Sequence, residues 1–127
     1  MRKETIPQHI AQPAYVPKKI IFRPWGSMVV HIARPSFWIK TLSLRSGGKT
    51  SVQLHHGRGE LWVCIRGEVI GWAGEKQVTM RPFQTLHVPR HMIHRLGSKT
   101  GGSVLEFAYG EPREDDIVRL ADDYGRI

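Results

Sequence analysis

The sequence predicts an all-β domain of the sandwich or barrel class. Between Ile20 and Tyr109, short β-rich runs alternate with turn signals such as Ser46–Gly48 and Lys99–Gly102. No long repeat or low-complexity tract interrupts this pattern. With 127 residues, 40% of them apolar, the chain has the length of one domain and enough apolar residues to build a core.

The first 19 residues are polar and carry Pro7, Pro13 and Pro17, so we expect an extended N-terminal arm (residues 1–19) before a folded domain (residues 20–127). The strands of that domain are predicted, in chain order, at Met28–Ala33, Phe37–Leu44, Ser51–His55, Glu60–Ile65, Val69–Trp72, Gln77–Met80, Thr85–Val88, Ile93–Leu96 and Ser103–Tyr109.

A short helix is predicted only at the C-terminus, over Asp115–Tyr124. Its first turn is acidic, which favours the positive end of the helix dipole, and Gly125 stands where a C-terminal cap would lie. Apolar residues recur there at helical spacing: Ile117, Leu120, Ala121 and Tyr124. We expect this helix to close over one side of the β domain.

The net charge of +8 comes from Lys and Arg residues that are scattered along the chain. A solvated surface is the first interpretation, an anionic small-molecule substrate such as a sugar phosphate is the second, and nucleic acid is not expected as a partner. No apolar run is long enough for a membrane span, and no apolar run follows the charged N-terminus as in a secretory signal. The single cysteine, Cys64, suits a reducing compartment, so a cytoplasmic location is predicted.

Four side chains are candidates for one metal site. Gln53 and His55 are two residues apart on a predicted strand and face the same way. Glu60 opens the next strand after a Gly57–Gly59 bend, and His94 follows on a later strand. Imidazole, carboxylate and amide groups suit a divalent cation, with zinc as the first choice and iron, manganese or nickel as alternatives. Four protein ligands would leave coordination positions open for a substrate.

The spacing of these residues resembles the two metal-binding motifs of the cupin family. The first motif runs from Gly47 to Gly67, with Gln53 at the position where most cupins carry a histidine, and the second matches Pro89 and His94. Four further segments resemble the type II mannose-6-phosphate isomerase family: Arg23–Ser27, Gln53–Trp62, Asp115–Arg119 and Asp123–Arg126. The resemblance implies a double-stranded β-helix (jelly roll) and an aldose–ketose isomerisation. The nucleotide-transfer half that often accompanies this cupin is absent from the sequence, so nucleotide transfer is not expected.

Three positions depart from the family pattern. Gly57 and Leu61 stand where the family usually has histidines, and His91 replaces a glycine of the second motif. The four candidate ligands survive these changes. We therefore rank three hypotheses: a mannose-6-phosphate isomerase-like enzyme, then a non-catalytic sugar or nucleotide-sugar binding cupin, which the lost histidines favour, and last a metal-dependent dioxygenase-type cupin.

Two charged residues are candidates for catalysis. Strand alternation places Lys40 among inward-facing apolar residues and Glu106 on the inner face of a late strand, where the two could pair. One of them would move the proton between C1 and C2. For the substrate phosphate, Arg58 is the first candidate, with Arg23 and Arg126 next. The strand Glu60–Ile65 is apolar on both faces, which favours a homodimer.

Overall fold

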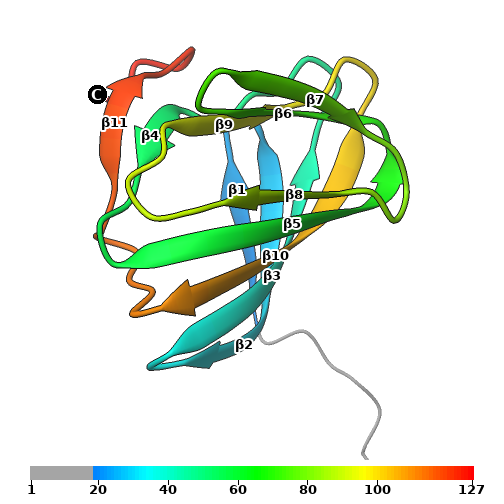
Figure 1. Ribbon diagram of the computed structural model, residues 1–127. Coiled ribbons are helices and arrows are strands. Elements are labelled where there is room, and N and C mark those ends of the chain that lie inside the picture. The colour runs from blue at the N-terminus through cyan, green and yellow to red at the C-terminus, as the bar shows by residue number, and fades with distance from the viewer. Residues whose placement is uncertain (1–18) are drawn as a thin grey trace, which may run out of the picture.

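Two antiparallel β-sheets face each other in the computed structural model, which describes residues 19–127 (Figure 1). The six-stranded sheet has the order β1-β2-β3-β10-β5-β8, and the five-stranded sheet has the order β11-β4-β9-β6-β7. The strands are β1 (Ile20–Arg23), β2 (Gly26–Arg34), β3 (Phe37–Leu44), β4 (Val52–Leu54), β5 (Arg58–Gly67), β6 (Val69–Ala73), β7 (Lys76–Met80), β8 (Thr85–Val88), β9 (His94–Gly97), β10 (Gly102–Gly110) and β11 (Val118–Ala121).

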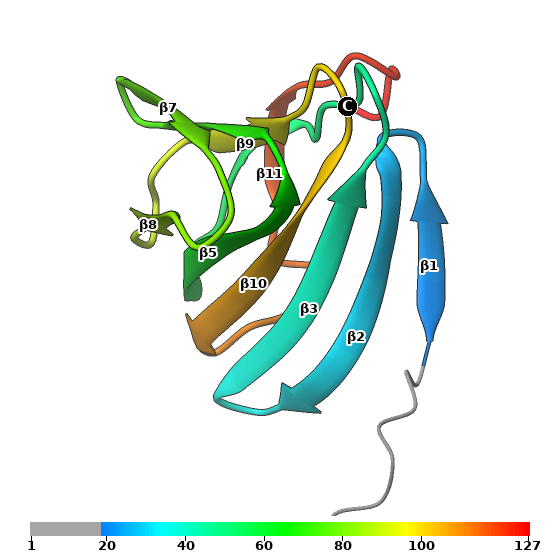
Figure 2. The same ribbon diagram turned by 90° about the vertical axis from the view of Figure 1, so that its right-hand side faces the viewer.

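The all-β prediction is confirmed, and every predicted strand is present with ends shifted by a few residues. Strand alternation explains why. In β3 every second side chain is buried, so Trp38, Lys40, Leu42 and Leu44 point inward. Figure 2 shows β1, β2, β3 and β10 side by side in one curved layer whose inner face turns toward the other sheet.

The predicted C-terminal helix is wrong. Residues 118–121 form β11, which pairs antiparallel with β4 at the end of the five-stranded sheet. A ten-residue helix is marginal by itself, whereas the free edge of β4 offers a row of backbone hydrogen-bond partners. The sequence analysis also missed β1, which pairs with β2. The predicted N-terminal arm falls almost entirely on residues 1–18, which lie outside the described part of the chain.

The core lies between the two sheets and includes Trp25, Trp62, Val69, Met80, Leu96 and Val104, all buried. Cys64 is fully buried and unpaired. Among residues 19–127, no helix has the length and apolar character that a membrane crossing requires. The inner face is not apolar throughout, because Lys40, His55, Glu60, His94 and Glu106 are also buried there.

Candidate metal centre

Three of the four predicted ligands converge in the interior. His55 follows β4, Glu60 lies on β5 and His94 opens β9, so two sheets contribute to one cluster. The three side chains are buried, and one possible ligand atom from each lies within 4.8 Å of the others. Nε2 of His55 lies 3.7 Å from Oε2 of Glu60, and Nε2 of His94 lies 3.3 Å from Oε1 of the same carboxylate.

Backbone carbonyls hold both imidazole rings in the orientation that a metal ligand requires. Nδ1 of His55 lies 2.7 Å from the carbonyl oxygen of Asp116, and Nδ1 of His94 lies 2.9 Å from that of Met92. A carbonyl can only accept, so each Nδ1 carries the donated proton. When the imidazole is neutral, Nε2 therefore carries a lone pair, and both Nε2 atoms lie near the Glu60 carboxylate.

The charges of the cluster also suit a cation. Burial lowers the pKa of His55 to about 4, so this ring is neutral near pH 7. Burial alone would raise the pKa of Glu60, but the hydrogen bond and charge of His94 hold it well below its usual range. Glu60 in turn raises the pKa of His94 against the effect of burial. An ionised carboxylate between two imidazoles that can each offer a lone pair fits a divalent metal.

Gln53, the fourth predicted ligand, lies beside His94 on the neighbouring strand. It is the direct partner of His94 in the pairing of β4 with β9, so the two side chains leave the sheet on the same face. Its amide nitrogen donates to the hydroxyl oxygen of Ser51 at 3.1 Å. The amide oxygen is then the group that remains for a metal.

Arg58, the first candidate for binding the substrate phosphate, lies in the interior beside the ligand cluster. Its side chain is buried, with Nε donating to Oε2 of Glu60 at 3.1 Å and Nη1 donating to the carbonyl of Arg113 at 2.6 Å. Its Nη2 lies 3.0 Å from Nε2 of His55. Three of the five N–H groups of this guanidinium are thus committed to the ligand cluster and the backbone, which leaves one N–H on each terminal nitrogen.

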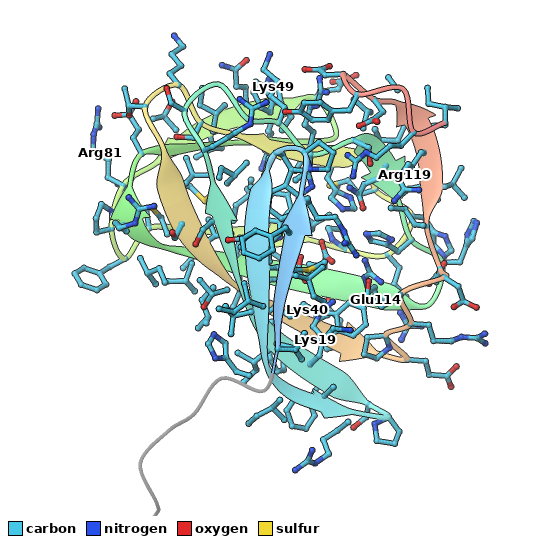
Figure 3. All side chains as sticks on the ribbon, turned by 180° about the vertical axis from the view of Figure 1, so that it is seen from behind. Lys19, Lys40, Lys49, Arg81, Glu114 and Arg119 are labelled. Atoms are coloured by element: carbon cyan, nitrogen blue, oxygen red, sulfur yellow. The ribbon has the colours of Figure 1, made fainter. Side chains whose placement is uncertain are left out.

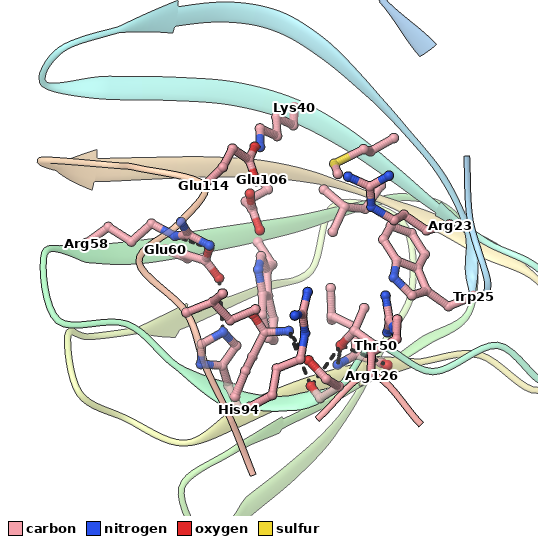
Figure 4. A pocket seen from close by; sticks show the side chains of 18 residues that line it. Arg23, Trp25, Lys40, Thr50, Arg58, Glu60, His94, Glu106, Glu114 and Arg126 are labelled. Atoms are coloured by element: carbon pink, nitrogen blue, oxygen red, sulfur yellow. Dashed lines mark hydrogen bonds and ion pairs between the residues drawn. The ribbon is translucent and has the colours of Figure 1, made fainter. Parts of the chain in front are cut away.

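A cavity of about 220 Å³ opens next to the cluster (Figure 4). Glu60, His94 and Gln53 line it, as do Lys40 and Glu106. Lys40 and Glu106 face each other as partners in β3 and β10, but they do not form the ion pair that the sequence suggested.

Each of these two charges has another partner. The Lys40 ammonium pairs with Glu114 and lies 3.8 Å from the centre of the Trp38 ring. The indole N–H of Trp38 donates to Oε2 of Glu106 at 3.0 Å. Figure 4 shows Lys40, Glu114 and Glu106 together on one wall of the cavity.

Glu106 is buried, and its pKa is raised. Burial is the main cause and the negative charge of Glu60 adds to it, so the pKa of Glu106 rises to about 8. The positive charges of Arg58 and Lys40 and the Trp38 hydrogen bond act in the opposite direction and only reduce the shift. A carboxyl group with this pKa exchanges its proton near neutral pH.

None of the three positions that depart from the family pattern lines the cavity. Leu61 faces outward from β5, where its neighbours are Phe107 and His87. His91 is exposed, and its Nδ1 lies 3.2 Å from that of His56 on the surface. Gly57 lies in the turn before β5, where its N–H donates to Asp116. These changes therefore leave the cavity wall intact.

Four residues near the site were not singled out from the sequence: Trp38, Glu114, Asp116 and Arg119. Asp116 supports the cluster twice, because its carbonyl accepts from His55 and its carboxylate accepts from the backbone N–H groups of His56 and Gly57. The pKa of Asp116 is lowered, since these hydrogen bonds outweigh the effect of desolvation. Asp116 and Arg119 belong to the C-terminal signature segment, which was the available signal.

Comparison with known proteins identifies the family. The sequence family described as "Mannose-6-phosphate isomerase C-terminal" matches residues 11–122. This chain belongs to that family. It is 35% identical over 109 residues to a mannose-1-phosphate guanylyltransferase of Klebsiella pneumoniae, and 32% identical to the alginate biosynthesis protein AlgA of Pseudomonas aeruginosa. Each match covers 84% of this chain but 23% of the relative, so the chain spans under a quarter of the length of these proteins.

Solved structures confirm the cupin fold. An RmlC-like cupin from Shewanella frigidimarina superposes with a TM-score of 0.71 at 16% identity, covering 82% of this chain and 96% of that one. The capsular polysaccharide assembling protein CapF from Staphylococcus aureus superposes with a TM-score of 0.70 at 12% identity, covering 84% of this chain and 33% of that one. The predicted jelly roll of the cupin type is therefore confirmed, without its C-terminal helix.

Proposed function

We propose that this domain is a metal-dependent isomerase that interconverts an aldose phosphate and a ketose phosphate, with mannose 6-phosphate and fructose 6-phosphate as the first pair to test. One observation carries the proposal: Glu60 and His94 of the ligand cluster, together with Gln53 and the buried Glu106 carboxyl group, line a single small cavity. The choice of sugar rests on the family, because the matching family is described as a mannose-6-phosphate isomerase domain.

The metal would be held by His55, Glu60 and His94, with the amide oxygen of Gln53 as the fourth ligand. Zinc is the first choice for this donor set, and iron, manganese and nickel remain candidates. When bound, such an ion supplies a Lewis acid for the carbonyl and hydroxyl oxygens of a sugar.

Glu106 is the proposed base that carries the proton between C1 and C2 of the substrate. A pKa of about 8 is close to a working pH near neutrality, so the carboxyl group can both accept and return a proton. The Trp38 N–H fixes one carboxyl oxygen and so orients the other. Lys40, held by Glu114, is proposed to stabilise the negative charge that develops on a substrate oxygen.

The cavity wall also contains a polar atom that lacks a hydrogen-bond partner, and a bound sugar would provide one. The indole nitrogen of Trp62 is buried and has no hydrogen-bond partner among residues 19–127. A buried donor without a partner costs about 1–3 kcal/mol. Because Trp62 lines the cavity, a sugar hydroxyl there would accept this bond.

The deciding experiment is a coupled assay for conversion of mannose 6-phosphate to fructose 6-phosphate by zinc-loaded protein. We expect turnover that EDTA abolishes and added metal restores. Glu106→Gln should lower kcat at least 100-fold, the usual scale of a general base. Glu75→Gln, an exposed residue in the turn after β6, is the matched control and should leave kcat unchanged. Turnover by Glu106→Gln at the control rate would remove the proposed role of Glu106.

A non-catalytic sugar-phosphate binding cupin is the second candidate, and the position of Arg58 favours it. Arg58 contacts both Glu60 and His55, so the protein supplies its own cation to the ligand cluster. Sugar-phosphate binding by metal-loaded protein without any turnover, for each of the four metals, would support this candidate over the isomerase.

We further propose a homodimer that forms through the outer face of the six-stranded sheet. This outer face is apolar across β3, β10 and β5, where Ile39, Phe107 and Leu61 stand opposite one another. The Phe107 ring lies 6.0 Å from that of Phe37 and 6.3 Å from that of Tyr109, which forms an aromatic row. The free, buried Cys64 fits a protein of the cytoplasm, which is the proposed location.

A further inference from the structure

The cavity is polarised from one end to the other. Glu60, Glu106 and Glu114 lie on one side, together with Lys40 and Arg58, and Arg23 and Arg126 lie on the opposite side. Arg119 also lines the cavity, and we call Arg23, Arg119 and Arg126 the arginine wall. Figure 4 shows Arg23 and Arg126 next to Trp25 and Thr50, across the cavity from Arg58 and Glu60. A ligand that fits both ends would carry its anionic group away from the metal cluster.

The register of the five-stranded sheet places Arg119 in line with the ligand cluster. Arg119 is the direct partner of Gln53 in the β11–β4 pairing, and Gln53 is the direct partner of His94 in the β4–β9 pairing. Directly paired residues project from the same face, so these three side chains form one row across three strands. The Cα atoms of Arg119 and His94 are then two strand spacings apart, roughly 10 Å.

Arg119 is the least engaged cation of the wall. It is exposed on β11 (Figure 3), and its side chain makes no hydrogen bond or ion pair within residues 19–127. The acidic residues near it are taken: Asp122 accepts twice from the Arg126 guanidinium, and Asp123 pairs with Arg95.

The other two arginines of the wall are more constrained. Arg23 uses only one nitrogen, in a bond to the carbonyl of Phe22. In Arg126, Nη1 is the guanidinium nitrogen without a partner among residues 19–127, because Nε and Nη2 both donate to Asp122. Arg119 and Arg23 therefore have free donors that point to no protein acceptor, while Arg126 adds charge from a fixed position.

We infer that Arg119 and Arg23 bind the phosphate of the substrate, with Arg126 behind them, and that the sugar extends from this wall toward Glu106 and the metal cluster. This inference rests on the proposed function for the identity of the sugar. A guanidinium fork suits a phosphate because two parallel N–H groups meet two oxygens. Arg58 is less suited to this role, since each of its three nitrogens already donates to a protein group.

The size of the cavity defines the ligand class. Its 220 Å³ lies below the 300–1,000 Å³ range that is typical of pockets for drug-sized ligands. A sugar monophosphate therefore fits better than a nucleotide sugar, which carries a second sugar and a base. The arginine wall discriminates between a phosphorylated sugar and its neutral counterpart, since only the former satisfies the free guanidinium groups.

The test measures binding without turnover. Isothermal titration calorimetry in EDTA would compare mannitol 1-phosphate, a hexitol phosphate that cannot isomerise, with mannitol. We expect the wild-type protein to bind the phosphate compound and not mannitol. Arg119→Gln should raise its Kd tenfold or more, about 1.4 kcal/mol. Arg23→Gln is a second variant, for which we also expect a higher Kd. An unchanged thermal midpoint would show that each variant is folded.

Arg81→Gln is the matched control, because Arg81 is an exposed arginine that pairs with Glu68 and does not line the cavity. It removes the same charge and should change the Kd less than twofold. Equal losses in Arg119→Gln and Arg81→Gln, or no binding by the wild-type protein, would overturn the inference. Loss of binding in Arg119→Gln alone would support it even if the isomerase assay showed no turnover. Turnover with an unchanged KM in Arg119→Gln would overturn it while the proposed function stood.

Discussion

Trp38 donates its indole N–H to Oε2 of Glu106 at 3.0 Å, across 68 residues of sequence. The bond joins β3 to β10 inside the six-stranded sheet and places a carboxyl group against an aromatic ring instead of the lysine opposite it. Its environment raises the pKa of Glu106 to about 8, mainly by burial. The titration of this one residue therefore predicts a pH dependence of stability that does not require knowledge of the substrate.

The direction of the pKa shift of Glu106 sets the sign of the pH dependence of stability. The pKa of Glu106 in the folded protein is higher than the ordinary glutamate value of about 4.5, so the folded protein binds the Glu106 proton more tightly than the unfolded chain does. Stability contributed by the neutral carboxyl group is present below about pH 4.5 and is lost as the pH rises through about 8. Each pKa unit corresponds to about 1.4 kcal/mol, so the loss is on the order of a few kcal/mol.

Glu106→Gln removes this titration and keeps the shape of the side chain. We expect the variant to gain unfolding free energy relative to the wild-type protein as the pH rises from 5 to 8. Urea denaturation in EDTA at pH 5, 6, 7 and 8 measures this difference. Glu75→Gln, an exposed carboxylate, should give a difference that does not change with pH. A constant difference for Glu106→Gln as well would show that the carboxyl group titrates normally.

Substitution of a proposed metal-binding histidine should abolish the stabilisation of the protein by metal. Zinc at 100 times its Kd adds about 2.7 kcal/mol to the unfolding free energy of a protein with one site. We expect this gain in the wild-type protein and not in His55→Ala or His94→Ala, with elemental analysis showing the matching loss of bound metal. His87→Ala is the control, because His87 is an exposed histidine that contacts Tyr109 outside the cavity. The same gain in His94→Ala as in His87→Ala would contradict the ligand assignment.

Arg58→Lys should lower the unfolding free energy of the metal-free protein, although the charge is kept. A lysine cannot reach the Glu60 carboxylate, His55 and the Arg113 carbonyl at once, so buried acceptors lose their donors. We expect a loss of about 1–3 kcal/mol in unfolding free energy, the usual cost of such groups. Arg113→Lys is the control, since Arg113 pairs with Asp115 on the surface and should show little change. Similar results for the two variants would mean that the Arg58 contacts do not stabilise the cluster.

The strands and the ligand cluster could be predicted from the sequence because both depend on residues that are close together in the chain. Strand alternation alone places Lys40 and Glu106 on inner faces, and the same rule puts Arg58 on the face of Glu60, which is why the two meet. The Lys40–Glu114 pair could not be predicted, because Glu114 lies 74 residues away in an irregular segment. The helix prediction was wrong because the segment with helical apolar spacing, residues 115–124, is short. The edge of β4 stabilises a strand there instead.

The proposed homodimer predicts that one charge on the outer face of the six-stranded sheet will separate the subunits. Phe107 is 37% exposed in the single chain and lies in the middle of the aromatic row. A lysine there can reach water in a monomer, but in a dimer its charge would be buried without a partner. We therefore expect sedimentation velocity to show a dimer for the wild-type protein and a monomer for Phe107→Lys, with the thermal midpoint of the variant confirming that it is folded.

Phe83→Lys is the matched control, because Phe83 is 84% exposed in the turn between β7 and β8 and is not part of the aromatic row. This variant carries the same change of residue and should remain a dimer. If Phe83→Lys is the variant that dissociates, the interface lies at the β7–β8 turn. If the wild-type protein is a monomer at tens of micromolar, the apolar outer face does not bind a second copy, and the dimer proposal fails independently of the metal site.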